Sequence, residues 1–309
     1  MSIPTWVVGS GGLLGSAVAR DLHRRGADIR TSRVPWGDPD RAKDTLFADA
    51  RKLIVDAAGG PWRMAWCAGA GVNGTSRDEF ARENGLMKDV LDELGTTNAG
   101  TGTIFHASSA GGVYAGAPGA PHTEASATAP LADYGYAKLD AESIVREFGE
   151  RTGTRTVIGR FANLYGPGQN LAKPQGLISH LCRGYLMSMP ISIYVPMDTL
   201  RDYVYVSDAA EMVVDSFKQA ENSPVGVVTK IYASGRSVTI GAILGACHSV
   251  FRTRPNVVLA SSPLASAQAR DLRLRSIVWT ELDQRPHRPL PAGIASTLDS
   301  IRRGLADQK

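Results

Sequence analysis

A tyrosine and a lysine four residues apart are the first pair in this sequence whose types and spacing could do chemistry. They are Tyr134 and Lys138, within ADYGYAKLDAE. Residues at this spacing meet on one face of a helix. A free tyrosine has a pKa of about 10 and is a poor base, but a nearby ammonium group favours the phenolate. The pair could move a proton on and off a substrate hydroxyl, although simple packing of the ring on the lysine stem gives the same spacing.

A glycine-rich loop near the N-terminus has the spacing of a dinucleotide site. The sequence GSGGLLG, residues 9–15, connects a predicted strand to a predicted helix. Small residues let the backbone approach a pyrophosphate, and the helix N-terminus supplies N–H donors. We therefore predict cofactor contacts from Gly9, Ser10, Gly11, Gly12, Leu13, Leu14 and Gly15.

The end of the second predicted strand indicates which form of the cofactor fits. An Asp or Glu there usually holds a free ribose 2′-OH, but this sequence has Ser32 and Arg33. Arginine offers a planar fork that suits a phosphate. We therefore favour NADP(H) over NAD(H), with Ser32 and Arg33 as contacts. The alternative is that Arg33 is only a solvated charge.

The elements that must position these residues alternate along the N-terminal half. Strands are predicted at 5–9, 27–32, 63–69, 102–108 and 155–160, and helices at 13–26, 76–94 and 134–150. This alternation is typical of βαβ units and a parallel sheet. After about residue 165 the pattern is less regular, which fits a smaller lobe laid over the sheet. We predict an α/β fold: a Rossmann-like doubly wound parallel sheet with a smaller C-terminal substrate-binding lobe.

Domain boundaries follow from this change of pattern. We assign residues 1–165 to a dinucleotide-binding domain, with roughly 200–238 returning to it, and residues 166–199 and 239–309 to the substrate-binding lobe. Asp133 is predicted to be the N-cap of the helix that carries Tyr134. The segment 115–130, rich in Gly, Pro and Ala, is predicted to be a mobile loop.

Composition narrows the class of function. With 43% hydrophobic and 21% charged residues the chain is an ordinary globular protein. We see no apolar run of membrane-spanning length and no signal peptide, and expect a cytoplasmic protein with no membrane partner. Three isolated cysteines and no HExxH spacing predict no disulfide framework and no metal site. The net charge of +4, without a basic stripe, favours small polyanions over nucleic acid.

Further motifs follow in order along the chain. They are SSAGGVYAG (108–116), TEASATAPLADYGYAKLDAE (123–142), RFANLYGPGQN (160–170) and RDYVYVSD (201–208). Together with Gly9, Gly12 and Gly15 and the closing helix LPAGIASTLDSIRRG, these motifs make the chain resemble the extended short-chain dehydrogenase/reductase family, also called the NAD-dependent epimerase/dehydratase family. Asn84 matches an Asn that this family carries at the start of a long helix. The resemblance covers nearly the whole chain.

The resemblance implies roles for the catalytic residues. Tyr134 is the acid/base, and Lys138 is its electrostatic partner and a ligand of the nicotinamide ribose. The family's third group, a Ser or Thr that hydrogen-bonds the reacting sugar oxygen, is displaced here, because Ala110 occupies its usual position. We choose Ser109, whose separation from Tyr134 suits the role, with Ser108 in reserve. The alternative for either serine is a hydroxyl that caps backbone groups.

The same resemblance implies the remaining contacts. Further cofactor contacts are Cys67, Ala68, Gly69, Ala107 and Phe161. Asn163 and Arg201 match positions that hold the diphosphate of a nucleotide-linked sugar, and Ser109 also touches the sugar. His106 is expected to be a buried, hydrogen-bonded histidine, and Tyr114 and Tyr136 packing residues.

The function implied is the modification of a nucleotide-diphosphate sugar through a 4-keto intermediate. We predict a nucleotide-sugar 4-epimerase. An NADPH-dependent 4-ketoreductase is the alternative to which Arg33 points, and a catalytically silent NADP-binding or sensing protein is the alternative from another class. Dehydration is disfavoured, because Ala110 and Gly111 replace the Asp-Glu pair usual in dehydratases. A homodimer is expected through the helices at 76–94 and 134–150.

Overall fold

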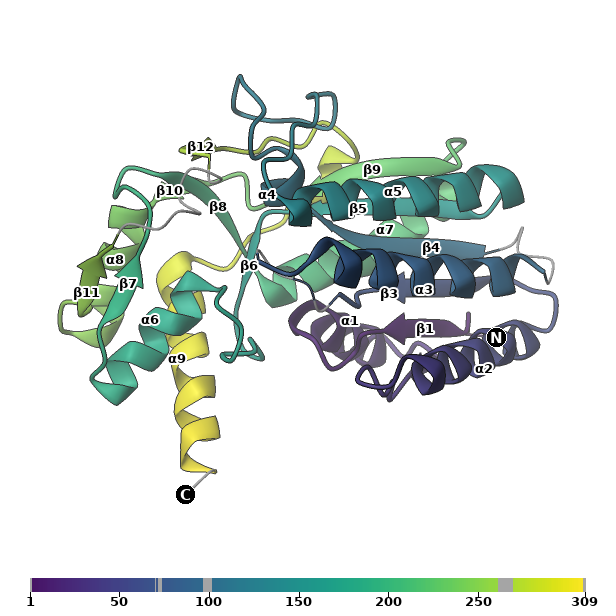
Figure 1. Cartoon of the computed structure of the whole chain (residues 1–309), viewed down its shortest axis with the longest axis horizontal. Coiled ribbons are helices and arrows are strands. Elements are labelled where there is room, and N and C mark those ends of the chain that lie inside the picture. Colours follow the sequence, from purple (N-terminus) through teal and green to yellow (C-terminus); the bar gives the residue numbers. More distant parts are fainter. Residues whose placement is uncertain (1, 70, 72–73, 97–101, 261–268, 308–309) are drawn as a thin grey trace.

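A parallel six-stranded sheet forms the centre of the larger part of the molecule (Figure 1). The computed structural model describes residues 2–69, 71, 74–96, 102–260 and 269–307. The strand order is β2-β1-β3-β4-β5-β9, and every neighbouring pair is parallel. The strands are β1 (Thr5–Val8), β2 (Ile29–Thr31), β3 (Trp62–Trp66), β4 (Gly102–Ser109), β5 (Arg155–Phe161) and β9 (Val227–Tyr232). The order reverses at β1 and β3, and ligands bind at the carboxyl ends of strands at such a point.

Helices cover both faces of this sheet. One side carries α1 (Leu13–Arg24) and α7 (Val206–Asn222), and the other carries α2 (Pro39–Ala57), α3 (Arg77–Gly95) and α5 (Asp133–Thr152). Side chains of β1 alternate between the two cores: Val7 joins the core under α1 and α7, and Trp6 and Val8 join the opposite core. The doubly wound α/β fold predicted from the sequence is confirmed. No helix in the described parts of the chain is long and apolar enough to span a bilayer.

The smaller part lies beside the carboxyl ends of the large sheet (Figure 1). Its helices are α6 (Leu177–Met187), α8 (Ile240–Phe251) and α9 (Leu290–Ala306). Its four-stranded sheet contains β6 (Asn163–Tyr165), β8 (Leu200–Tyr205), β10 (Ser237–Thr239) and β12 (Asp271–Leu272), and a separate parallel pair contains β7 (Ile191–Ile193) and β11 (Val257–Leu259). A short α4 (Ala110–Val113) and a 3-10 turn η3 (Thr280–Leu282) complete the elements described here. After β8, α7 and β9 return to the large sheet; the division into two domains stays a prediction.

The start of α5 differs from the sequence prediction. Ala132, not Asp133, is the N-cap residue, and it makes no side-chain cap bond. Asp133 lies inside the first turn, where its carboxylate accepts a hydrogen bond from Arg77 Nε at 2.6 Å. The carboxylate is therefore used to join α5 to α3 rather than to cap the helix.

The segment 115–130 is anchored rather than mobile. The Gly116 N–H donates to Ala129 O at 2.7 Å, and the Tyr114 hydroxyl donates to Thr123 O at 2.9 Å. Glu124 accepts the Ile231 N–H at 2.8 Å, which fastens the segment to β9. The Gly and Pro content predicted flexibility, but these longer-range bonds fix the backbone.

Candidate active site

The loop between β1 and α1 is shaped by glycines that cannot be replaced. Gly9 has a φ of 81°, and a Cβ there would lie 2.6 Å from Ala68 N. A Cβ on Gly15 would lie 2.2 Å from Gly9 O. The turn closes with a hydrogen bond from Gly12 N to Gly9 O at 2.9 Å, and Gly12 caps α1 without a side chain. Backbone N–H groups at the start of α1 thus face a space free of side chains, which fits a dinucleotide pyrophosphate.

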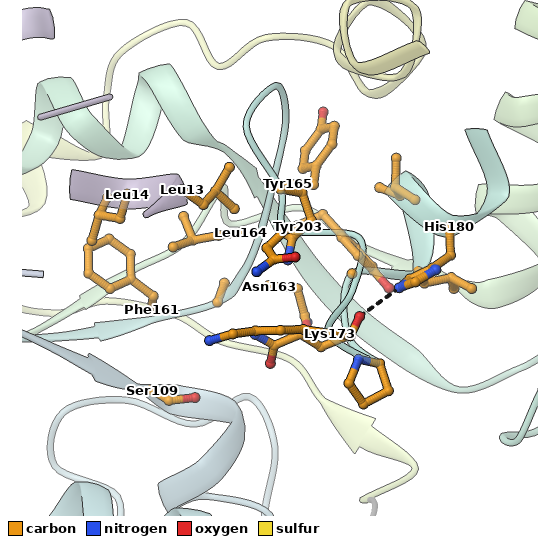
Figure 2. Close-up of a pocket in the computed structure, with 18 of the residues that line it drawn as sticks. Leu13, Leu14, Ser109, Phe161, Asn163, Leu164, Tyr165, Lys173, His180 and Tyr203 are labelled. Carbon is orange, nitrogen blue, oxygen red and sulfur yellow. Dashed lines mark hydrogen bonds between the residues drawn. The ribbon is translucent and has the colours of Figure 1, made fainter. Parts of the chain in front are cut away.

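A cleft of about 840 Å³ extends from this loop to the smaller part of the molecule. Most predicted cofactor contacts line it: Gly11, Gly12, Leu13, Leu14, Cys67, Ala68, Gly69, Ala107, Tyr134, Lys138 and Phe161. Ser108, Ser109, Asn163 and Arg201 line it as well. Three other predicted contacts, Gly9, Ser10 and Gly15, shape the glycine loop but do not line the cleft. The last two, Ser32 and Arg33, follow β2 and lie outside the cleft lining. Figure 2 shows Leu13, Leu14 and Phe161 on one side of the cleft and His180 on the other.

Close contact between α4 and α5 positions Tyr134 and Lys138. A Cβ on Gly135 would lie 2.3 Å from Gly112 O, so only glycine lets the two helices meet there. Lys138 Nζ donates to Ala107 O at the end of β4 (3.3 Å) and lies 5.8 Å from the centre of the Tyr134 ring. The phenol and the amine therefore come together at the carboxyl end of β4, where a substrate hydroxyl could reach both.

The two candidate serines have different surroundings. Ser109 is the N-cap of α4, and its Oγ accepts the Gly112 N–H at 3.2 Å, so its own O–H can donate to a ligand in the cleft. Ser108 is 5% exposed, and its hydroxyl donates to Glu142 at 2.5 Å. Ser109 is thus the better donor to a reacting oxygen, whereas the Ser108 hydroxyl is already used.

Ser108 belongs to a buried polar network that sequence reasoning missed. Glu142 pairs with Arg160 at 2.7 Å, and Arg160 Nη1 donates to the Tyr114 hydroxyl at 2.6 Å. Burial alone lowers the pKa of Arg160, but the hydrogen bonds and charge of Glu142 raise it overall. The network joins β4, α5 and β5 behind Tyr134 and Lys138. Tyr114, fully buried, is confirmed as a packing residue.

Arg201 and Asn163 lie on the neighbouring strands β8 and β6. Arg201 is 8% exposed, donates to Leu200 O at 2.9 Å, and has no carboxylate of the described residues within ion-pair distance. Burial lowers the pKa of its guanidinium. The Asn163 amide donates to Asp202 O at 3.0 Å. A buried cation without a paired carboxylate, open to a cleft, suits an anionic ligand.

Some side chains at the end of β2 already make hydrogen bonds or ion pairs within the protein. The Ser32 hydroxyl accepts from Trp6 Nε1 at 2.7 Å and donates to Asp49 at 2.5 Å. Arg30 pairs with Asp56 at 2.6 Å. Arg33 is exposed just after the strand. Arg33 rather than Ser32 is therefore the side chain available to a 2′-phosphate.

Three smaller predictions need correction. His106 is buried as predicted, but neither ring nitrogen has a hydrogen-bond partner among the described residues. Burial, and next the charge of Lys138, lower its pKa to about 3. Tyr136 is 53% exposed and so is not a buried packing residue. Asn84 lies inside α3, not at its start, and donates to Ala137 O at 2.9 Å.

Sequence reasoning also missed Lys173 and His180, which line the cleft from the segment 166–176 and from α6. His180 Nε2 is hydrogen-bonded to Lys173 O at 3.0 Å (Figure 2). Their only signal in the sequence was their position soon after the RFANLYGPGQN motif. Among the described residues that line the cleft there is no Asp or Glu, whereas Lys138, Lys173 and Arg201 are cationic.

Comparison with known proteins places these features in context. The model of the NAD dependent epimerase/dehydratase family matches residues 5–231. The dTDP-4-dehydro-6-deoxyglucose reductase of Escherichia coli is 27% identical over 200 residues, which span 64% of this chain and only 61% of the reductase.

Solved structures share the fold over almost the whole chain. The UDP-glucose 4-epimerase of Thermus thermophilus, in complex with NAD, is 22% identical with a TM-score of 0.81, covering 97% of this chain and 99% of that one. The UDP-glucose 4-epimerase of Thermotoga maritima with UDP-glucose is 20% identical with a TM-score of 0.81, covering 98% and 100%.

Proposed function

We propose that this chain, which belongs to the NAD dependent epimerase/dehydratase family, is a nucleotide-sugar 4-epimerase that acts through a 4-keto sugar. The family's members include nucleotide-sugar epimerases, dehydratases and reductases. One observation carries the proposal: Tyr134, Lys138 and Ser109 face the same cleft as the glycine loop.

Each residue has a defined task in this proposal. The Tyr134 oxygen takes the proton of the sugar C4 hydroxyl, Lys138 holds a positive charge beside that tyrosine, and Ser109 donates a hydrogen bond to the same sugar oxygen. A bound nicotinamide dinucleotide supplies the acceptor and donor of hydride. Asn163 and Arg201 hold the diphosphate while the keto sugar presents its other face.

The test uses purified protein with UDP- and dTDP-linked hexoses and no added cofactor. We expect a product of unchanged mass by mass spectrometry and of inverted C4 configuration by NMR, without net change in the absorbance of reduced nicotinamide. Tyr134→Phe should lower the rate by about 10²–10⁴-fold, the usual contribution of a general acid/base. A silent binding protein would instead show no turnover of any nucleotide sugar, and a Tyr134→Phe variant would not differ from the wild type.

An NADPH-dependent 4-ketoreductase is the second candidate. It is favoured by the exposed Arg33 and by the similarity to the Escherichia coli reductase. If one NADPH is consumed for each 4-keto sugar, and no epimer forms from the parent hexose, the protein is the reductase and not the epimerase.

We propose NADP(H) as the preferred cofactor, with Arg33 as the residue that discriminates. The support is the absence of an acidic side chain at Ser32 and Arg33, although the Thermus structure carries NAD. Arg33→Ala should weaken NADP⁺ binding by about tenfold or more and leave NAD⁺ binding nearly unchanged, because a phosphate–guanidinium contact is lost. Calorimetric titration measures both. Tighter binding of NAD⁺ than of NADP⁺ by the wild type would contradict the preference.

A further inference from the structure

One segment of the chain reaches from the smaller part of the molecule to the glycine loop. Residues 166–176, which we call the strap, connect β6 to α6, and several of them line the same cleft as the glycine loop. In Figure 1 the strap loops out between α6 and α1. A Cβ on Gly168 would lie 3.9 Å from Ser16 Oγ and 4.0 Å from Leu13 Cδ1, which is van der Waals contact with the start of α1. The strap therefore ends its reach at the expected pyrophosphate site.

The strap is fastened to α6 by its second half. His180 Nε2 on α6 is hydrogen-bonded to Lys173 O at 3.0 Å, and Arg183 Nη1 donates to Leu171 O at 3.4 Å. The approach to α1, in contrast, is made at Gly168, which has no side chain. The strap is therefore anchored on α6, and its first half is the part that can lift away from α1.

The middle of the strap is held by little buried surface. Tyr165 before it and Leu177 after it pack in the core of the smaller part, whereas none of the described residues 167–176 belongs to an apolar core. Segments with few buried apolar contacts open at a low free energy. Gly168 has a φ of 98°, a backbone conformation that glycine adopts readily, so it can serve as a hinge.

We propose that the strap closes the cleft over a bound nicotinamide dinucleotide, and that the cofactor enters and leaves when the strap lifts off α1. The inference rests on the proposed function. The pyrophosphate would bind at the start of α1, which Gly168 contacts, so a closed strap blocks its exit. Retention of the reduced cofactor lets the sugar that gave up hydride take it back, as epimerisation requires.

The test ties the strap to α1 with a disulfide. The double variant Ser16→Cys, Gly168→Cys places a thiol on each side of the 3.9 Å contact, close enough for the bond. Diamide oxidises the pair by taking up two electrons and two protons. Protein loaded with NADPH is oxidised and mixed with excess NADP⁺, and release is followed by nicotinamide fluorescence; NADH with NAD⁺ is run in parallel. Each single cysteine variant controls for oxidation of the three native cysteines.

The tied, loaded protein should release NADPH at least about a hundredfold more slowly than the same protein kept reduced, because a lid that cannot open holds its ligand. Dithiothreitol should restore the rate of the reduced protein. The tied, empty protein should fail to take up NADPH. The readout is cofactor release, so it does not depend on which sugar the enzyme prefers.

A single substitution tests the hinge without a disulfide. Gly168→Ala should raise the rate of NADPH release about tenfold, because an L side chain disfavours the positive φ of the closed strap. Gly59→Ala is the matched control, because Gly59 has a φ of 80°, nothing within 4 Å of its Cβ, and a place between α2 and β3 outside the cleft lining. The control should release NADPH at the wild-type rate. Thermal unfolding of each variant checks that it is folded.

Other outcomes overturn the inference. Unchanged NADPH release in the tied protein, or in Gly168→Ala, would place the exit route elsewhere and leave the dinucleotide site intact. Failure of the two introduced thiols to join would refute the contact between the strap and α1. A wild type that binds neither NADPH nor NADH would instead refute the proposed function itself.

Discussion

Ser109 and Ser108 are adjacent in sequence, yet the structure gives their hydroxyls different tasks. Ser109→Ala removes a donor that faces the cleft and should lower kcat by about a hundredfold, as for other donors to a reacting oxygen. Ser108→Ala removes a hydrogen bond to the buried Glu142 and should lower the free energy of unfolding by about 1–3 kcal/mol. Steady-state kinetics and urea unfolding on both variants separate the two effects. The assignment is wrong if Ser108→Ala loses more kcat than Ser109→Ala.

His106 should make stability sensitive to acid. Its pKa is lowered to about 3 in the folded chain by burial, against about 6.5 when unfolded. The unfolded state therefore binds the extra proton as pH falls below about 6.5, and the folded state loses about 2 kcal/mol between about pH 7 and pH 5. Burial also lowers the pKa of His122, which acts in the same direction.

The measurement is urea unfolding at both pH values for the wild type and for His106→Leu. The variant should lose about 2 kcal/mol less on acidification than the wild type, whatever its stability at neutral pH. An identical acid dependence in the two proteins would show that His106 is protonated, or partnered, in the folded state.

Local spacing determined which site residues could be predicted. Tyr134 and Lys138 are one helical turn apart, so their meeting follows from the helix alone. Lys173 could not be found in this way, because its place in the cleft depends on how the segment 166–176 crosses the lobe. The pairing of Glu142 with Arg160 likewise depends on which side chains of α5 and β5 meet when the helix packs on the sheet.

At the scale of elements, prediction succeeded where hydrophobic periodicity is strong. No range was predicted for α2, α7 or β9. The other five strands of the large sheet and the helices α1, α3 and α5 were predicted with small errors at their ends. The short strands of the smaller part were not. β12, for example, pairs with β8 through Asp271 and Leu200, a contact that no local pattern signals. The start of α5 was misplaced because Arg77, distant in sequence, holds the Asp133 carboxylate.

The contact of α4 with α5 gives a prediction at this scale. Gly135→Ala places a Cβ 2.3 Å from Gly112 O and 2.6 Å from Pro130 Cβ, so α5 must shift and carry Tyr134 with it. We expect a loss of stability of about 1–3 kcal/mol and a lower kcat. Gly245→Ala on the exposed side of α8 is the control, since nothing lies within 4 Å of its Cβ. That change should be neutral or stabilise by about 0.5–1 kcal/mol.

The element prediction is checked by urea unfolding and steady-state kinetics of both glycine variants. Full activity and stability in Gly135→Ala would mean that α4 and α5 can separate without cost, and that their contact does not position the phenol.

At the scale of the whole molecule, several short passages of chain couple the two parts. β5 ends at Phe161 in the large sheet, and β6 begins at Asn163 in the small one. At this crossing the two parts are joined through a single buried residue, Ala162, and at a second crossing β8 runs directly into α7. If the proposed cofactor and substrate bind on opposite sides of the cleft, these short links hold the two binding regions close together.

Assembly into an oligomer is also a property of the whole molecule. The homodimer and the cytoplasmic location both stay predictions. We expect a homodimer through α3 and α5, where Tyr136 is 53% exposed and the ion pair of Arg77 with Asp133 joins the two helices. An exposed aromatic ring rimmed by charges is typical of an interface centre. Tyr136→Asp should raise the dimer dissociation constant by about thirtyfold or more, because truncating such an anchor costs at least about 2 kcal/mol.

Light scattering over a concentration series measures this constant. Leu259→Asp tests the rival surface, because Leu259 is 65% exposed on β11, in the other part of the molecule. That change should leave the dimer intact if α3 and α5 form the contact. A monomeric wild type would refute the dimer, whereas dissociation by Leu259→Asp alone would move the interface to β11. Because Tyr136 follows Tyr134 by two residues, a contact at α5 would also place the catalytic helix against the partner and make its first turn more rigid.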